Sequence, residues 1–181
     1  LEFFAFIVGL VKLLGDVPQM LRVRHLEGEI VYREGQLEPG RYLVLVPVAA
    51  TTDAAALGSL GSLLAQPERG QILALTVIKV PSLLNPLAGR VLLRERRPLV
   101  EIVREQARRQ NVPVQVMIRA SRNVPNGILR TIQKSGSDLA LFGWPRPMSG
   151  DEYAFSAVVD PIIADPPCDI AVLRHLSLIH I

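Results

Sequence analysis

Residues 124–142 read VPNGILRTIQKSGSDLALF and combine a helix, a stop signal and a strand in direct succession. Apolar residues recur every four positions, at Val124, Ile128 and Ile132, which is the spacing of one helix face. Gly136 follows at the place where a helix commonly ends in a left-handed residue. The LALF run that comes next has the length and composition of a strand buried on both faces. This order predicts a helix that packs on a sheet of buried strands.

Four further apolar runs of strand length occur in the chain: LVLVPV (43–48), ILALTVI (72–78), VPVQVMI (112–118) and IAVL (170–173). The five strand starts, with that of LALF, are 29, 40, 27 and 31 residues apart, close to the length of a strand–helix–strand unit. Four of the runs are continuously apolar, as parallel strands with helices on both faces must be. The sequence therefore predicts an α/β fold with an open, doubly wound, five-stranded parallel sheet.

The segments between these strands have helical patterns. Residues 53–65 form a helix rich in small residues, which favours close packing, and Thr51, Thr52 and Asp53 are candidates for its N-cap. Residues 92–109 are amphipathic, and Pro98 either kinks this helix or lies in its first turn. A last helix is expected over residues 151–165.

Composition limits the classes of function. The 181 residues are 49% hydrophobic and 20% charged, with a net charge of +3, so the chain suits one folded domain and has no strong basic bias toward nucleic acid. Cys168 is the single cysteine, which excludes an internal disulfide and a thiolate metal cluster. The three histidines are scattered without metal-ligand spacing, so no metal site is expected.

The ends of the chain differ from its centre. Residues 1–15, LEFFAFIVGLVKLLG, are too short for a full membrane span and are interpreted as the end of a truncated transmembrane helix, with an amphipathic or buried helix as the alternative. The basic residues that follow suit the cytoplasmic side of a membrane. Residues 16–41 are predicted to be a mixed-charge linker with one short strand, EIVYRE, before a domain over 42–174. Residues 175–181, HLSLIHI, are interpreted as a non-native tail.

In a doubly wound sheet, ligands bind beyond the carboxyl ends of the strands where strand order reverses. Here those ends carry LVPVAATTD after the first strand and GWPR after the fourth. Together with VPNGILRTIQKSGSDLALFG and the final PCDIAVLR, these segments resemble the universal stress protein family from the first strand to Arg174. The resemblance implies a Rossmann-like α/β/α sandwich.

The resemblance also implies a candidate nucleotide site, and a degenerate one. Family members that bind ATP carry a G-x-x-G-x9-G-S/T loop, whose glycines let backbone amides surround phosphates. Gly143 matches the first position, whereas Arg146, Ser156 and Ala157 replace the second glycine, the third glycine and the hydroxyl. Ala49 stands where the family places an aspartate, beside the other candidate positions Val48 and Thr51. ATP or another nucleotide is therefore disfavoured unless Arg146 compensates, and no cofactor or catalytic residue is expected.

The loop at Gly143 and the tract before the first strand resemble the universal-stress-like domains at the C-terminus of amino acid permeases. This implies a non-enzymatic regulatory or assembly domain at the cytoplasmic face of the cell membrane. The alternative is a soluble nucleotide-binding stress protein. The resemblance also implies that the last strand lies at a sheet edge and pairs with its copy in a homodimer. Its residues Ile170, Ala171, Val172 and Leu173 agree with this, because no charge or proline protects the edge.

Overall fold

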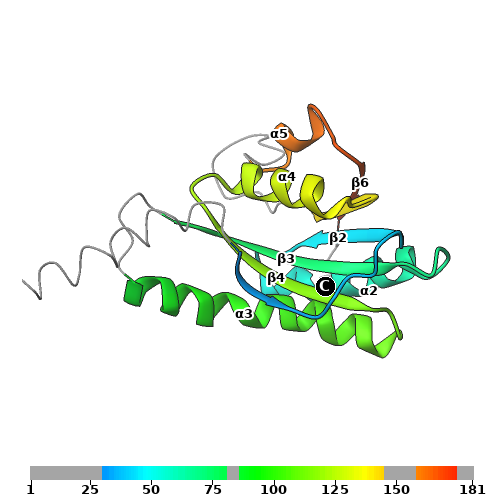
Figure 1. The fold of residues 1–181 in the computed structure, drawn as a ribbon, viewed down its shortest axis with the longest axis horizontal. Helices are drawn as coiled ribbons and strands as arrows, with labels where there is room; N and C mark the ends of the chain where they lie inside the picture. Colours follow the sequence, from blue (N-terminus) through cyan, green and yellow to red (C-terminus); the bar gives the residue numbers. More distant parts are fainter. Residues whose placement is uncertain (1–29, 81–85, 145–157, 175–181) are drawn as a thin grey trace, which may run out of the picture.

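A six-stranded sheet lies between two layers of helices in the computed structural model, which describes residues 30–80, 86–144 and 158–174 (Figure 1). The strand order is β1-β4-β3-β2-β5-β6, and all neighbouring strands are parallel except the pair β1–β4, which is antiparallel. The elements are β1 (Ile30–Glu34), β2 (Leu43–Pro47), α2 (Thr51–Ala65), β3 (Gln71–Lys79), α3 (Pro86–Arg109), β4 (Val114–Ser121), α4 (Val124–Ser135), β5 (Leu139–Gly143), α5 (Asp160–Ile163) and β6 (Asp169–Leu173).

Each central strand contributes to two separate hydrophobic cores. Val44 and Val46 of β2 pack with α2 and α3 on one face of the sheet, whereas Leu43 and Leu45 pack with α4 and α5 on the other. Successive side chains of a strand point to opposite faces, so a strand covered on both sides must be apolar at every position. This confirms the predicted α/β class, and Figure 1 shows α2 and α3 on one side of the sheet and α4 and α5 on the other.

The number of strands is one more than predicted. The short strand expected within the linker is β1, and it pairs antiparallel with β4 at the sheet edge. The five predicted strands are confirmed as parallel, and β1 adds one antiparallel strand at this edge. The mixed polarity of IVYRE concealed the pairing, because an edge strand has one face open to solvent and lacks the continuous apolar pattern of the centre.

Helix α2 differs from its prediction at the start. The N-cap is Ala50, which provides no side-chain cap, so the prediction that Thr51, Thr52 or Asp53 caps the helix is wrong. Its predicted close packing is confirmed by Gly58, where a Cβ atom would lie only 3.1 Å from the Cα atom of Val103 in α3. A larger residue at this position would push the two helices apart.

The other helices agree with their predicted bounds to different degrees. Helix α4 begins after Asn123, whose side chain accepts a hydrogen bond from the Asn126 amide (3.0 Å), and it ends at Gly136 with φ of 63°, as predicted. Helix α3 is longer than predicted, and Pro98 lies inside it. Helix α5 covers only part of the predicted helix, of which residues 151–157 lie outside the described part of the chain, as do the segments 1–29 and 175–181.

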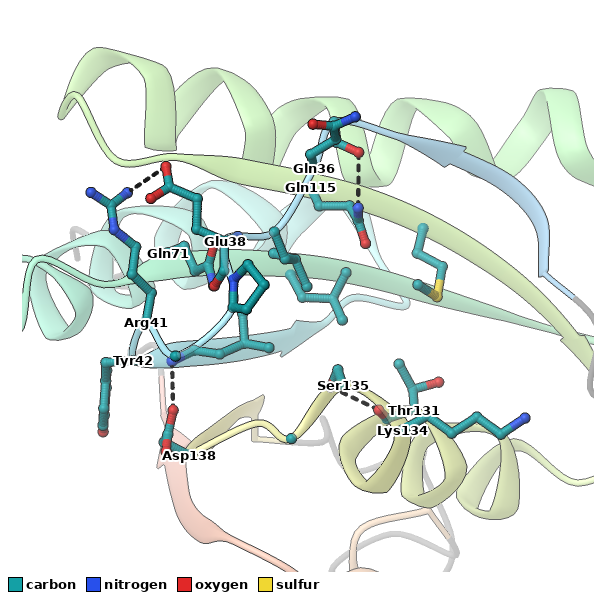
Figure 2. Close-up of a pocket in the computed structure, with 18 of the residues that line it drawn as sticks. Gln36, Glu38, Arg41, Tyr42, Gln71, Gln115, Thr131, Lys134, Ser135 and Asp138 are labelled. Carbon is teal, nitrogen blue, oxygen red and sulfur yellow. Dashed lines mark hydrogen bonds and ion pairs between the residues drawn. The ribbon is translucent and has the colours of Figure 1, made fainter.

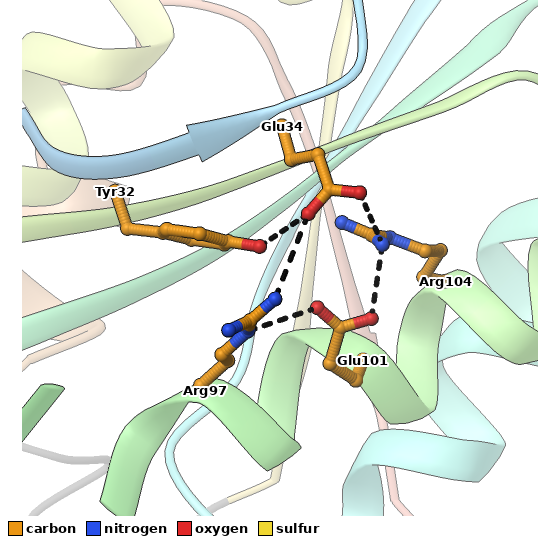
Figure 3. Close-up of polar contacts among 5 residues, drawn as sticks. All are labelled: Tyr32, Glu34, Arg97, Glu101 and Arg104. Carbon is orange, nitrogen blue, oxygen red and sulfur yellow. Dashed lines mark hydrogen bonds and ion pairs between the residues drawn. The ribbon is translucent and has the colours of Figure 1, made fainter. Parts of the chain in front are cut away.

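A polar network fixes the edge strand β1 to helix α3 (Figure 3). The carboxylate of Glu34 accepts hydrogen bonds from Arg104 (2.9 Å) and from the hydroxyl of Tyr32. Glu101 pairs with Arg104 at 3.2 Å, and the guanidinium of Arg97 lies 4.8 Å from the centre of the Tyr32 ring. Since Tyr32 and Glu34 stand opposite Ile118 and Val116 of β4, this face of β1 closes the core on the α3 side.

The network predicts acid-sensitive stability. Hydrogen bonds from Arg104 and Tyr32 lower the pKa of Glu34 from 4.5 to about 2, so its contribution is complete above pH 4.5 and is lost as the pH falls toward about 2. We expect Glu34→Gln to lower the urea midpoint at neutral pH, and the difference from wild type to vanish across this interval. Equilibrium unfolding at a series of pH values measures the effect.

The control for that series is Glu105→Gln, which removes an exposed ion pair with Arg109 within α3. Exposed pairs of this kind contribute little to stability, so this variant is expected to have the same urea midpoint as wild type at every pH. A constant difference between wild type and Glu34→Gln down to about pH 2 would contradict the role assigned to Glu34.

Strand β6 forms the opposite edge of the sheet, as the family resemblance implied. The amide of Asp169 donates to the carbonyl of Asp138, and the carbonyl of Leu173 accepts from the amide of Trp144. Backbone groups alternate in direction along a strand, so Ile170 and Val172 direct their amides away from β5. These two residues offer backbone donors to a further strand.

A dimer that forms by β6 pairing would therefore be sensitive to Val172→Pro. Proline deletes an outward amide and leaves the hydrogen bonds to β5 in place. We expect residues 30–174 to sediment as a dimer at tens of micromolar and the variant as a monomer, whereas Val172→Ala, which keeps the amide, remains dimeric. A monomeric wild type in sedimentation equilibrium would contradict pairing through β6.

Candidate functional site

The candidate site lies where the strand order reverses, between β2 and β5. From β2 the sheet continues through β3 to β4 on one side, and through β5 to β6 on the other. A cavity of about 350 Å³ lies beyond the carboxyl ends of these strands, at the lower end of the range for small-molecule sites. The fold therefore places a concave site where the sequence predicted one.

The wall of this cavity is mainly apolar. Thr52, Asp53 and the indole of Trp144 supply its polar side-chain atoms. The remaining lining residues come from β2, β3, β5, the helices α2 and α4, and the turn before α5: Pro47, Val48, Ala49, Ala50, Leu57, Leu75, Val77, Val124, Ile128, Phe142, Gly143, Val158 and Val159. Such a wall suits an apolar or aromatic group better than a charged one.

The backbone after β2 already has partners within the protein. The amide of Val48 donates to the carbonyl of Leu75 (2.8 Å), and the Val48 carbonyl accepts from the hydroxyl of Thr76 (2.9 Å). The carbonyl of Ala49 accepts from Nη1 of Arg96 in α3, at 3.1 Å. These bonds hold the loop in place, and they occupy the Val48 amide that a ligand might otherwise use.

Asp53 contributes an acidic group to the cavity. It lies half-buried in the first turn of α2, where a carboxylate interacts favourably with the helix dipole. A Cβ atom built on Gly143 would lie 4.0 Å from Oδ2 of Asp53, so this carboxylate borders the end of β5. The sequence placed Asp53 at a helix cap, whereas the structure places it in the wall of the site.

Trp144 connects the cavity to the last strand. Its amide donates to the carbonyl of Leu173 (2.7 Å), and the guanidinium of Arg174 lies 5.5 Å from the centre of its ring. The side chain is 38% exposed and also lines the cavity. The indole therefore packs at the sheet edge and presents part of its surface to the site.

The structure brings together some of the predicted site residues. Val48, Ala49 and Gly143 line the cavity. Thr51 is the exposed first residue of α2 and is not part of the wall. The predicted loop residues Arg146, Ser156 and Ala157 lie outside the described residues. Sequence reasoning had not assigned Thr52 or Asp53 to the wall, although their position directly after the first strand is a signal that could have found them.

The carboxylate of Asp53 is the ionisable group that the described residues bring to this cavity. The thiol of Cys168 lies apart from the cavity wall, and burial raises its pKa, which disfavours the reactive thiolate. Across residues 30–80, 86–144 and 158–174, no three His, Cys, Asp or Glu side chains are arranged to hold a metal ion. The described residues can enclose a small group beside the carboxylate of Asp53.

Comparison with known proteins relates part of the chain to a membrane transporter. No protein family model matches the chain. Over 137 residues the chain is 26% identical to the Na⁺/H⁺ antiporter NhaS5 of Synechocystis sp., an alignment that covers 75% of this chain and 20% of the antiporter. The chain thus spans about a fifth of the length of that protein.

Solved structures relate the fold to universal stress proteins. UspA of Lactobacillus plantarum is 20% identical with a TM-score of 0.54, and 75% of this chain covers 99% of that one. A Burkholderia pseudomallei family member is 13% identical with a TM-score of 0.58, over 75% and 98% of the two chains. The Archaeoglobus fulgidus protein in complex with dAMP is 9% identical with a TM-score of 0.55, over 73% and 96%. The chain therefore has the fold of the universal stress proteins.

Proposed function

We propose that this chain is a regulatory or assembly domain of a membrane transporter, held at the cytoplasmic face of the membrane. The observation that carries the proposal is the similarity to NhaS5, in which a segment of this length accounts for a fifth of a transporter. In this proposal the domain is attached to a transport unit and does not itself form the transport path. The kind of transporter is part of the proposal: the sequence resemblance favours an amino acid permease, and the antiporter similarity favours a cation exchanger.

The residues before the domain support a membrane attachment. No helix among residues 30–80, 86–144 and 158–174 is long and apolar enough to cross a bilayer. Residues 3–11, FFAFIVGLV, carry no charge, and Lys12, Arg22 and Arg24 follow them. Basic residues that flank a membrane helix favour the cytoplasmic side, so the domain would lie in the cytoplasm after a last transmembrane helix.

A non-enzymatic role agrees with the chemistry of the cavity. Its wall is mainly apolar, with Thr52, Asp53 and Trp144 as the polar exceptions. A phosphate group near Asp53 would be repelled by the carboxylate, and the backbone of Val48 is already paired. We therefore propose that the nucleotide site is degenerate and that the domain acts by contact with other parts of a transporter, as a homodimer and without nucleic acid.

A soluble nucleotide-binding stress protein is the second candidate. The observation that favours it is the cavity itself, which lies at the strand-order reversal of a fold that the A. fulgidus protein shares in complex with dAMP. In this alternative the indole of Trp144 or the carboxylate of Asp53 would contact the base or the ribose, and Arg146 would supply charge to a phosphate. The two candidates differ in nucleotide affinity and in membrane association.

Nucleotide affinity gives the first test. We expect residues 30–174 to bind ATP with a dissociation constant no better than millimolar, because each lost glycine, hydroxyl or acid removes a hydrogen bond worth about 1 kcal/mol. Titration calorimetry measures it directly. A micromolar dissociation constant for ATP, with binding lost in Arg146→Ala, would favour the nucleotide-binding candidate. Arg108→Ala, an exposed residue at the end of α3, is the matched control.

Membrane association gives the second test. We expect the full chain to remain in the membrane pellet after an alkaline carbonate wash and residues 16–181 to move to the supernatant, since an exposed run such as FFAFIVGLV must be buried in lipid or protein. The full chain with Phe6→Asp and Val8→Asp serves as a length-matched control that should also be released. Thermal unfolding should be the same for both soluble forms. If removal of residues 1–15 abolishes cooperative unfolding, this segment is an integral helix of the domain and the membrane attachment is wrong.

A further inference from the structure

A second and larger cavity lies at the opposite edge of the sheet from the candidate site. Its volume is about 1190 Å³, and it extends from the amino ends of β2 and β3 to the surface between β4, β1 and α4 (Figure 2). Polar side chains line much of it, including those of Gln71, Gln115 and Thr131. This cavity shares no lining residue with the apolar one.

The distinctive group of this cavity is Arg119 of β4. Its side chain points to the same sheet face as Met117, which packs against Ile128 and Ile132 of α4. The residue is only 3% exposed, and within the part of the chain that the structure describes its Nε and Nη1 atoms have no hydrogen-bond partner. A buried charge without a partner is unfavourable, so this guanidinium costs stability unless it pairs with an anion.

The charges around Arg119 are positive. Burial, together with Arg130 of α4 and Arg33 of β1, lowers the pKa of Arg119, and no carboxylate among the described residues offsets their effect. Arg33 stands opposite Met117 in the β1–β4 pairing, so it lies on the same face of the sheet. Lys134 follows Arg130 by one helical turn and lines the cavity with Arg33 and Arg119.

The acidic residues that line the cavity are Glu38, Glu68 and Asp138, and two of them have partners that the structure shows. Glu38 pairs with Arg41 at 3.0 Å, and Oδ2 of Asp138 accepts from the amide of Leu43 at 2.7 Å. Figure 2 shows these two groups on the far side of the cavity from Lys134. Glu38 and Asp138 are therefore already paired within the protein, whereas Arg33 and Lys134 line the same cavity as the buried Arg119.

We propose that Arg119, Arg33 and Lys134 bind a phosphate group in this cavity, with Arg130 adding to its positive potential. A guanidinium suits phosphate because its parallel N–H groups can donate to two oxygens at once. Four cations from β1, β4 and α4 favour a group with more than one negative charge over a single carboxylate. The phosphate could belong to a soluble phosphorylated compound or to a lipid headgroup, and the two sources can be told apart.

The test uses the full chain in a neutral maltoside detergent. Inorganic pyrophosphate is the soluble probe, and dihexanoyl phosphatidic acid, with dihexanoyl phosphatidylcholine as its zwitterionic control, is the lipid probe. We expect at least one anionic probe to raise the melting temperature and to bind in calorimetry, because a ligand that binds only the folded state stabilises it. Stronger binding of pyrophosphate indicates a soluble ligand, and stronger binding of phosphatidic acid indicates a headgroup.

Arg119→Leu separates a binding role from a structural one. Loss of a charged hydrogen-bond donor should weaken probe binding by about tenfold or more. The same change removes an unpaired buried charge, so the melting temperature without probe should rise. A residue that only supports the fold would instead lower the melting temperature when replaced.

Variants at two exposed residues test the proposed binding site even if Arg119→Leu does not fold. Arg33→Gln and Lys134→Gln should each weaken binding severalfold without changing the fold, whereas Arg108→Gln in α3, on the other side of the sheet, should leave it unchanged. The proposal is overturned if neither anionic probe binds wild type, if these variants bind as wild type does, or if binding appears only after residues 1–29 are removed. The last result would mean that an acidic residue of this chain is the partner of Arg119.

Discussion

The fold depends on one constraint: the central strands are buried on both faces. Val44 and Leu45 of β2 are adjacent in sequence but lie in different cores, one under α2 and α3 and the other under α4 and α5. Backbone amides and carbonyls at such depth must pair with neighbouring strands, and β2 meets this need between β3 and β5. After β2 the chain forms β3 and β4 on one side of that strand, and then β5 and β6 on its other side. The strand order therefore reverses between β2 and β5, and the apolar cavity lies beyond the carboxyl ends of these two strands.

Burial of the central strands on both faces also explains which parts of the fold could be predicted from the sequence. The apolar runs of β2, β3 and β5 are direct consequences of packing, and the glycine that ends α4 is required by its left-handed backbone conformation. The class of fold and the place of the cavity therefore follow from the sequence. The strand β1 was predicted, but its pairing with the sheet does not follow from the sequence, since Tyr32 and Glu34 are anchored by Arg97 and Arg104 of α3, which lie far away in sequence. The predicted strand 112–118 ended before Arg119 for the same reason, because an arginine in a buried strand has no sequence pattern that separates it from a surface residue.

The candidate site was less predictable than the fold. The loop positions carried over from the family resemblance include Gly143, which lines the cavity, but the wall is completed by Asp53 and by residues from β3 and α4. These residues come together only through the parallel pairing of β2 with β3 and the packing of α4 on the sheet. Spacing in sequence cannot predict the resulting balance between an apolar wall and one carboxylate.

Strand β1 is part of both the proposed phosphate site and the proposed connection to a membrane. Its Tyr32 and Glu34 side chains face α3 and attach the strand to the domain, whereas Arg33 between them faces the cavity of Arg119. The strand also follows directly on residues 1–29, the segment proposed to connect the domain to a membrane. A phosphate held by Arg33 and Arg119 would bridge β1 and β4 on one face while the Glu34 network bridges β1 and α3 on the other. Ligand binding would thus reinforce the strand through which a transporter and this domain would be mechanically coupled, and a change in ligand would alter the stability of that connection.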